Sequence, residues 1–578
     1  MERGTTRIIV GIVIMGLAAP VGALVLPYLS GIATASLSAD EQVKQISIEL
    51  PPLGWSSWNS FSNTINSQIV MKQARAMVDS GMKKAGYQYI NIDEGWWLGQ
   101  RDANGNIVVD TKQWPALEPG ERVGDMSNIV RYIHSLGLKA GIYTDAGEAG
   151  CGFYGPDLGP PMPHTGSEGH YEQDFLQFAK WGFDYVKVDW CGGSKENLDP
   201  AVQYGEIAHA IQNAENITAH RLYYSVCNWG NNSPWTWAPG IGGAHADIWR
   251  TSGDIVAPIV AGTPNSSRRA ELKAVLGNFD QGVHPEAQHT GYYNDLDMMV
   301  LGMPGLNDTQ NRVHMSLWAI SGAPLLVGAD LTKLSPTQVA TLTNPDVLAI
   351  DQDALGLQGV KLSEQGNGLQ IWCKVLAPSG TRAALLLNRG TSAAEMKLTW
   401  NDIGLTVSDA KVKDVWAGRE LGELSAYSSQ VPAGDAVLLL IRGTGSNATD
   451  YAVSSSSAEL RGGATLELCK PCAAGHMVRL GGEREVRFNV PAFARPTLVE
   501  IHYLNLGPTD LMMQLRANGR LPTNILCAST GSEAIVGSVI IEIEPERSAR
   551  QSTLVFSSSG GAGLALETII VLPLGSSQ

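Results

Sequence analysis

Short apolar runs alternate with longer amphipathic segments over residues 48–353. The runs are rich in β-branched and aromatic residues, and the longer segments carry apolar residues at helical spacing. The predicted strands are Leu53–Asn59, Tyr87–Asp93, Leu138–Asp145, Tyr185–Trp190, Tyr223–Trp229, Asp247–Thr251, Tyr293–Met299 and Pro324–Asp330. The predicted helices are Ser67–Ala85, Met126–Leu136, Tyr171–Trp181, Ala201–Asn213 and Asn311–Ser321.

Eight strands that alternate with helices predict an α/β fold, a closed parallel (β/α)₈ TIM barrel. An open doubly wound sheet would show the same alternation. No glycine-rich phosphate-binding loop follows the first predicted strand, however, so the barrel is favoured.

The pattern changes after Asp353, because strand-like runs then follow one another without helices. Residues 357–443 predict an antiparallel β-sandwich, and the Gly, Ser, Thr and Asn residues of 444–458 predict a linker. Residues 459–578 predict an additional β-sandwich-like module. The predicted strands of the first sandwich are Leu369–Val375, Ala383–Asn388, Met396–Trp400 and Ala436–Arg442. Those of the second are Met477–Leu480, Glu485–Val490, Leu498–Leu504, Val539–Glu544, Thr553–Phe556 and Leu564–Leu572.

The first 35 residues resemble a targeting segment. Arg3 and Arg7 precede an apolar run from Ile8 to about Leu29, and the small residues Ala33-Thr34-Ala35 follow. This pattern predicts a signal peptide and a secreted protein, extracellular or periplasmic. The run is long enough to suggest a membrane anchor instead, but its two prolines favour cleavage.

The charge of the chain limits its partners. A formal net charge of −15 argues against nucleic acid or an anionic membrane as the partner, because neither would meet a basic surface. A neutral small-molecule or polysaccharide substrate fits better. We therefore expect no partnership with nucleic acid, and none with a membrane once the signal peptide is removed.

Acidic residues end several of the predicted barrel strands. Asp93 and Glu94 close the second strand, Asp145 the third and Asp189 the fourth, and Asp254 follows the sixth. Catalytic groups of a parallel barrel lie at the carboxyl ends of its strands. A single such acid is as often a helix cap or turn former, but several on one rim indicate a site for a polar or cationic ligand.

Six segments in the same order resemble glycoside hydrolase family 27, the α-galactosidase family, over residues 50–442. They are Leu53-Gly54-Trp55-Ser56-Ser57-Trp58-Asn59, Asn91-Ile92-Asp93-Glu94-Gly95-Trp96, Gly141-Ile142-Tyr143-Thr144-Asp145-Ala146-Gly147, Lys187-Val188-Asp189, Trp249-Arg250-Thr251-Ser252-Gly253-Asp254 and Asn294-Asp295-Leu296-Asp297-Met298. The resemblance implies that Asp189 is the catalytic nucleophile and Asp254 the acid/base. It also implies a sugar pocket lined by Trp55, Asp93, Glu94, Lys187, Cys227, Trp229, Arg250 and Met298.

The residue types agree with that chemistry. A retaining glycosidase needs two carboxyl groups about 5–5.5 Å apart, of which one attacks the anomeric carbon and the other protonates the leaving oxygen. Lys187 lies two residues before Asp189, so on a strand both side chains point to the same side, where the cation keeps the carboxylate ionised. The alternative is a purely structural ion pair. Trp55 and Trp229 have two interpretations as well, as sugar platforms or as barrel packing.

The seven cysteines leave at least one thiol without an internal partner. Family resemblance implies a disulfide between Cys151 and Cys191. The C-x-x-C sequence of Cys469 and Cys472 favours a local disulfide, because a zinc site needs further ligands and only Cys527 is close in sequence. The pairing of Cys373 and Cys527 stays open. We expect neither a metal nor a cofactor.

Three functions fit these residues. The first is an α-galactosidase acting on terminal galactose, and the second is a β-L-arabinopyranosidase acting on terminal L-arabinopyranose. The second is suggested by Glu94, which stands where the family usually has a second Asp. The third is a catalytically inactive sugar-binding protein, which the presence of both catalytic carboxylates disfavours. The C-terminal module is loosely similar to carbohydrate-binding β-sandwiches, with a structural spacer as the alternative.

Overall fold

The computed structural model describes most of the chain after residue 49. The described residues are 50–151, 165–240, 246–256, 268–285, 287–288, 291–365, 368–377, 380–443, 448–470, 472, 474–507, 511–527, 536–543, 551–558 and 563–574. The predicted signal peptide of residues 1–35 lies outside them. None of the helices in the described part of the chain is long and apolar enough to cross a membrane.

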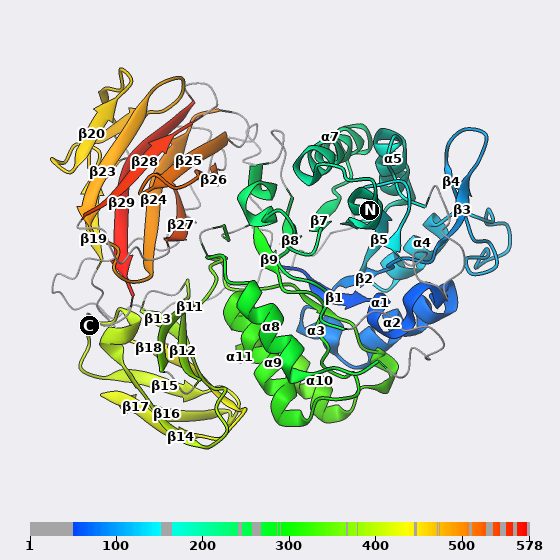
Figure 1. Cartoon of the computed structure of the whole chain (residues 1–578), viewed down its shortest axis with the longest axis horizontal. Helices are drawn as coiled ribbons and strands as arrows, with labels where there is room; N and C mark the ends of the chain where they lie inside the picture. Colours follow the sequence, from blue (N-terminus) through cyan, green and yellow to red (C-terminus); the bar gives the residue numbers. More distant parts are fainter. Residues whose placement is uncertain are drawn as a thin grey trace, which may run out of the picture. The chain divides into compact units, whose positions relative to one another are not determined.

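A parallel barrel forms the first part of the structure. Its strands are ordered β10-β1-β2-β5-β6-β7-β8-β9, with parallel pairing between all neighbours (Figure 1). A parallel bridge between Met299, just after β9, and Val327 on β10 joins the two ends of the sheet. The strand bounds are β1 Leu53–Ser56, β2 Tyr89–Asn91, β5 Lys139–Asp145, β6 Tyr185–Asp189, β7 Tyr223–Cys227, β8 Ile248–Arg250, β9 Tyr293–Asp295 and β10 Leu325–Val327. This confirms the predicted (β/α)₈ fold.

Aromatic side chains fill the inside of the barrel. Tyr185 and Tyr223, from β6 and β7, stack with ring centroids 5.7 Å apart, and Tyr89 of β2 packs at an angle to both. Tyr293 and Met298 belong to the same buried cluster. Packed barrel interiors of this kind fix the strands in place, so residues at the strand ends are held on a rigid support.

The helices between the strands match the prediction in part. The predicted helix Ser67–Ala85 is interrupted, because Gly81 has a φ of +86° and separates α2 from α3. Five helices of the described part of the chain were not predicted: α1, α6, α8, α10 and α11. Helix bounds are α1 Trp58–Phe61, α2 Ser67–Asp79, α3 Met82–Ala85, α4 Ser127–Ser135, α5 Tyr171–Trp181, α6 Cys191–Lys195, α7 Pro200–Thr218, α8 Leu272–Gln281, α9 Asp308–Ser321, α10 Pro336–Leu342 and α11 Pro345–Asp351.

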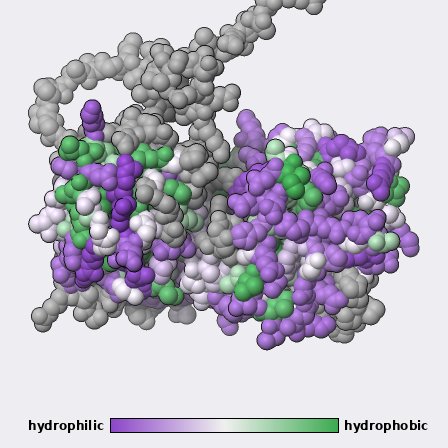
Figure 2. Space-filling model, turned by 90° about the horizontal axis from the view of Figure 1, so that it is seen from above, coloured by the Kyte–Doolittle hydropathy of each residue, from purple (hydrophilic) through white to green (hydrophobic). Residues whose placement is uncertain are grey.

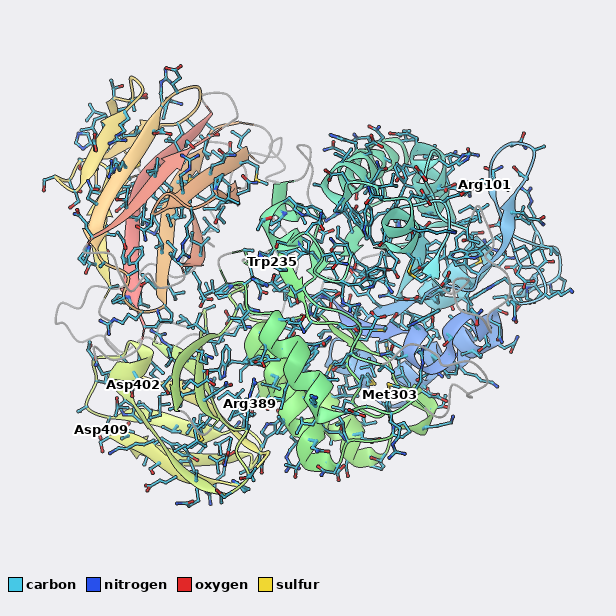
Figure 3. The ribbon with its side chains drawn as sticks, viewed as in Figure 1. Arg101, Trp235, Met303, Arg389, Asp402 and Asp409 are labelled. Carbon is cyan, nitrogen blue, oxygen red and sulfur yellow. A yellow bond between two sulfur atoms is a disulfide. The ribbon has the colours of Figure 1, made fainter. Side chains whose placement is uncertain are left out.

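A hairpin that the sequence did not predict follows β2. It consists of β3 (Trp97–Arg101) and β4 (Ile107–Val109). Arg101, labelled in Figure 3, forms a two-armed ion pair with Asp174 of α5 at 2.7 and 2.9 Å, and both side chains are buried. The hairpin lies on the same side of the barrel as the acidic strand ends, because β3 begins three residues after Glu94. The ion pair between Arg101 and Asp174 holds it against α5.

The second part is the predicted antiparallel β-sandwich. A six-stranded sheet, β11-β12-β13-β18-β15-β16, faces the pair β14-β17. Helix α9 packs on β12 and β13, and Arg389 forms a two-armed ion pair with Asp280 of α8, both at 2.8 Å (Figure 3). The strands are β11 Val360–Gln365, β12 Leu369–Val375, β13 Thr381–Asn388, β14 Ala394–Thr399, β15 Ala410–Asp414, β16 Arg419–Leu424, β17 Ala426–Val431 and β18 Ala436–Arg442.

The third part is a second β-sandwich with its own core (Figure 1). One sheet has the order β21-β22-β29-β24-β27 with β19 on β29, and the other has the order β20-β23-β28-β25-β26. Its strands are β19 Thr449–Ala452, β20 Ala458–Arg461, β21 Leu466–Leu468, β22 His476–Arg479, β23 Glu485–Pro491, β24 Thr497–Asn505, β25 Leu511–Ala517, β26 Thr523–Cys527, β27 Gly537–Ile543, β28 Gln551–Ser557 and β29 Leu564–Pro573.

Strand β19 corrects the expected linker of residues 444–458. Residues 449–452 pair with β29 instead of crossing solvent freely, and β20 begins at Ala458. The segment is polar, so its sequence predicted a linker. A strand at the edge of a sheet can form with polar side chains, because backbone hydrogen bonds hold it in place.

Hydrophilic side chains predominate on the described surface visible in Figure 2.

Candidate active site

Lys187 and Asp189 lie at the carboxyl end of β6. The strand register sets Tyr143 of β5 beside Lys187, and Cys227 of β7 beside Asp189. Lys187 Nζ is 3.6 Å from Asp189 Oδ2 and 3.0 Å from Asp93 Oδ2. The sequence spacing correctly placed the lysine and the aspartate on one side of the strand, and the structure adds Asp93 as the second partner of the lysine.

The surroundings of Asp189 disfavour the ionised form of its carboxyl group. Burial raises the pKa of this carboxyl, and the nearby carboxylates of Asp254 and Asp93 raise it further, whereas Lys187 lowers it. The backbone N–H of Trp190 also donates to Asp189, at 3.1 Å. Lys187 is therefore the cation that favours an ionised Asp189, and Asp254 lies close enough to Asp189 to act on it electrostatically.

Asp254 follows β8 in the loop that begins at Thr251. Its Oδ1 accepts a hydrogen bond from Arg250 Nη2 at 3.2 Å, and its side chain is 45% exposed, in contrast to the buried Asp189. Arg250 is itself held by Asp297 at 3.1 Å, and Asp297 accepts the backbone N–H of Ile255 at 2.8 Å. One buried carboxylate thus positions both the arginine and the loop that carries Asp254.

Asp145 serves a different purpose from the other strand-end acids. Its carboxylate accepts backbone N–H groups from Gly147, Cys191 and Gly192 at 2.7–3.0 Å. It therefore ties the loops after β5 and β6 together. Burial, followed by the charge of Asp189, raises the pKa of Asp145 to about 8, although its three backbone hydrogen bonds oppose that shift.

A disulfide joins the same two loops, as expected. Cys151 and Cys191 are bonded, with their Cα atoms 5.1 Å apart. These two sulfurs and Asp145 are close enough to hold a metal ion, but the disulfide bond occupies both sulfurs. The structure also pairs Cys469 with Cys472, and Cys227, Cys373 and Cys527 are buried and outside these two disulfides.

We expect loss of the Cys151–Cys191 disulfide to lower the free energy of unfolding of the barrel by about 4 kcal/mol. The bridge closes a loop of 40 residues, whereas the Cys469–Cys472 bridge closes only three. The Cys469–Cys472 bridge lies in the second β-sandwich, so the matched double variant Cys469→Ser/Cys472→Ser should leave the unfolding of the barrel unchanged. Tryptophan fluorescence in urea would follow the barrel and the first β-sandwich, because no Trp lies beyond residue 416. Equal midpoints for Cys151→Ser/Cys191→Ser and the unmodified chain would contradict this.

A cavity inside the carboxyl end of the barrel brings several of the predicted sugar-pocket residues together. Asp93, Lys187, Cys227, Arg250 and Met298 all line it. Arg250 Nη1 lies 3.7 Å from the Cys227 sulfur, and burial raises the pKa of that thiol well above its ordinary value. Cys227 therefore contributes a neutral thiol to the wall.

Five of the predicted residues do not line this cavity: the two tryptophans, Glu94 and the two expected catalytic residues, Asp189 and Asp254. Trp55 is fully buried, and its indole N–H donates to the Ala329 carbonyl at 2.9 Å. Trp229 is half-buried in the loop after β7, with a φ of +56°. Trp55 is therefore packed inside the barrel, as the second interpretation of this residue expects. Its contact with a sugar stays a prediction.

Glu94 points to a different part of the site from Asp93. Its side chain is fully buried, and a Cβ placed on Gly150 would lie 2.3 Å from Glu94 Oε1 and 3.1 Å from the Trp97 ring. The longer carboxylate therefore occupies the space beside Gly150, in the loop after β5, while Asp93 turns to Lys187.

Sequence reasoning left three residues of this site unassigned. Asp297 holds Arg250, Asp295 stands beside Arg250 in the β8–β9 register, and Tyr143 places its ring 5.1 Å from Lys187 Nζ. Two of them are strand-end acids in a segment that carries the family resemblance, Asn294–Met298. Their partners could not be deduced, because β8 and β9 are far apart in sequence.

Comparison with known proteins agrees with this geometry. Residues 50–353 match the family model described as alpha galactosidase A, and residues 366–441 match that of the alpha galactosidase C-terminal beta sandwich domain. A probable alpha-galactosidase of Dictyostelium discoideum is 35% identical over 68% of this chain and 93% of its own length. Alpha-galactosidase A of Cellvibrio japonicus is 36% identical over 70% of this chain and 95% of its own length.

A solved structure is similar over the same part of the chain. Alpha-galactosidase I from Mortierella vinacea superposes with a TM-score of 0.58 and 29% identity, over 70% of this chain and 99% of that one. The barrel, its ring of strand-end carboxylates and these matches define a glycoside hydrolase. The chain belongs to glycoside hydrolase family 27, the alpha-galactosidase family.

Proposed function

We propose that this protein is an exo-acting α-galactosidase that removes terminal α-D-galactose by double displacement. The observation that carries the proposal is the pairing of two differently placed carboxyl groups. Asp189 is buried beside Lys187, and Asp254 is partly exposed beside Arg250. Relatives at 35–36% identity carry the name alpha-galactosidase, which supports galactose as the sugar.

In the first step, Asp189 attacks the anomeric carbon while Asp254 donates a proton to the leaving oxygen. The product of this step is a covalent galactosyl-enzyme ester with inverted configuration. In the second step, Asp254 accepts a proton from water, which displaces Asp189 and inverts the carbon again. Asp93, Lys187 and Arg250 are proposed to bind and orient the sugar hydroxyls, since a pocket of charged donors and acceptors rejects sugars that leave them unpaired.

The function is tested by rates on p-nitrophenyl α-D-galactoside and p-nitrophenyl β-L-arabinopyranoside, measured side by side. The α-galactoside should be cleaved with the higher kcat/KM. Proton NMR of the first-formed sugar should show the α-anomer, because two inversions give net retention. A first-formed β-anomer would exclude double displacement, and failure to cleave either substrate would favour a sugar-binding protein.

Glu94 is proposed to set the preference between galactose and L-arabinopyranose. The two sugars share their ring hydroxyl pattern, but L-arabinopyranose lacks the hydroxymethyl group. The carboxylate of Glu94 lies beside Gly150, outside the cavity that Asp93 lines, so its extra methylene is proposed to reduce the room for that group from the neighbouring wall. One methylene in a fitted pocket discriminates by about 10–200-fold.

We therefore expect Glu94→Asp to raise kcat/KM for the α-D-galactoside, relative to the β-L-arabinopyranoside, by at least about tenfold. Asp93→Glu is the matched opposite change, and it should lower both rates because Asp93 binds Lys187 at 3.0 Å. An unchanged ratio in Glu94→Asp would mean that Glu94 does not determine the specificity.

We also propose that the protein is secreted. The Cys151–Cys191 bridge supports this, because structural disulfides persist in oxidising compartments. Fractionation of cells that express the full chain would test it, and recovery of the enzyme only with the cytosol would contradict it.

A further inference from the structure

The second β-sandwich has a hollow that the proposed catalytic function does not use. It measures about 440 Å³ and lies on the outer face of the sheet β20-β23-β28-β25-β26. Ligand sites in proteins commonly measure about 300–1,000 Å³. The hollow is lined by Arg487, Arg516, Asn518, Gly519, Gln551, Thr553 and Val555.

Strand alternation places two arginines on either side of one valine. Phe488 and Phe556 point into the core, so Arg487 and Val555 point outwards. In the strand register Val555 is opposite Arg487 on one side and Arg516 on the other. Neighbouring strands are about 4.8 Å apart, so the two arginine Cα atoms are separated by about 10 Å. Two long side chains at that distance reach over Val555 to one small anion.

Within the described part of the chain, no hydrogen bond or ion pair joins either arginine to a carboxylate. Arg487 Nη2 donates only to the Thr553 hydroxyl, at 3.4 Å, and its buried Nε has no hydrogen-bond partner there. Glu459 faces Arg487 across the β20–β23 pair, but both of its oxygens are bound by Arg461 at 3.0 Å. Arg487 lines the hollow, and carboxylates and sulfates are the groups that a guanidinium binds most strongly.

The other lining groups narrow the ligand class. Asn518, Gln551 and Thr553 offer amide and hydroxyl groups suited to sugar hydroxyls. Among the described residues the lining contains no aromatic ring, which is the usual platform for a neutral sugar. The chain as a whole carries a net charge of −15, whereas the hollow is lined by two arginines and by no carboxylate among the described residues.

We propose that this face binds an acidic sugar residue of a polysaccharide, through a carboxylate or sulfate group held between Arg487 and Arg516. The choice of a sugar, rather than another anion, rests on the proposed function. Such a site would hold the enzyme on an acidic polysaccharide while the barrel removes its terminal galactose residues.

The test is affinity electrophoresis of the full chain through gels that contain polygalacturonate, a sulfated galactan or neutral galactomannan. The acidic gels should retard the enzyme, and neutral galactomannan should not retard it through this site. Arg487→Gln/Arg516→Gln should weaken the retardation by at least about tenfold in apparent affinity. Hydrolysis of p-nitrophenyl α-D-galactoside should not change in that variant.

Arg131→Gln and Arg479→Gln are matched controls, because they remove the same charge from arginines that are already paired with Glu121 and Glu467. Both should keep the affinity. Arg487→Lys/Arg516→Lys, which keeps the charge, should bind with intermediate affinity and confirm an intact fold.

Retardation only by polygalacturonate identifies a carboxylate as the ligand, and retardation only by the sulfated galactan identifies a sulfate. Equal retardation of the unmodified chain and the double glutamine variant overturns the site, as does an equal loss in the control variants. An enzyme that binds acidic gels but does not cleave the galactoside would refute the proposed function and leave the site standing.

Discussion

Asp189→Ala is expected to lower kcat for α-D-galactosides by at least about 10⁴-fold, as removal of a nucleophile does in other hydrolases. The physical reason is that no covalent ester can form, so the barrier of a single displacement by water must be crossed. The fold should survive, because Lys187 keeps its ion pair with Asp93 at 3.0 Å. Near-normal turnover in this variant would remove Asp189 from the mechanism.

Azide should partly restore the rate of Asp189→Ala, because a small anion fits the space left by the carboxylate. It would attack from the face that Asp189 uses and give β-galactosyl azide. Asp184→Ala is the control at the opposite end of the same strand, where Asp184 precedes β6 and binds His134 at 2.8 Å. That variant should lose stability rather than turnover, since catalysis belongs to the carboxyl ends of the strands.

Asp254→Ala is expected to slow substrates according to their leaving group. A poor leaving group, such as a sugar, needs the proton of Asp254, and its cleavage should fall by about 10²–10⁴-fold. A dinitrophenyl group leaves without protonation, so its release in the first step should fall far less. Rapid-mixing measurement of the first turnover would separate the two. Equal losses on both substrates would contradict the acid/base role.

Azide also distinguishes Asp254 from Asp189. In Asp254→Ala the galactosyl-enzyme still forms, and azide then displaces Asp189 to give α-galactosyl azide, the opposite anomer from that of Asp189→Ala. The same anomer from both variants would mean that one role is misassigned. Asp280→Ala is the matched control, because Asp280 is also a partly exposed aspartate bound to an arginine, Arg389 at 2.8 Å, and its loss should leave both steps unchanged.

The candidate site shows where sequence reasoning succeeded. Lys187 and Asp189 were placed on one side of a strand by their spacing alone, and the structure separates Lys187 Nζ from Asp189 Oδ2 by 3.6 Å. The acids at the ends of β2, β5 and β6 were predicted to share one rim, and parallel pairing of those strands places them there. The period of a strand and the direction of a parallel sheet are local properties, so they can be deduced without coordinates.

The same reasoning could not separate the tasks of those acids. Asp145 and Asp189 both end a barrel strand, but Asp145 accepts three backbone N–H groups and fixes two loops. Asp297 was not assigned at all, although it holds both Arg250 and the loop with Asp254. These roles depend on which atoms meet across strands and loops distant in sequence.

The sequence by itself determined the alternation of strands and helices that builds a barrel, the family motifs and the acids at the strand ends. Each of these features depends only on residues that are close together in the sequence. Only the tertiary structure decided that Trp55 is packed away from the cavity, that Glu94 occupies the space beside Gly150, and that β19 pairs with β29. It also placed Arg487 and Arg516 on either side of Val555. Each of these follows from contacts between distant segments, which hydrophobic periodicity does not encode.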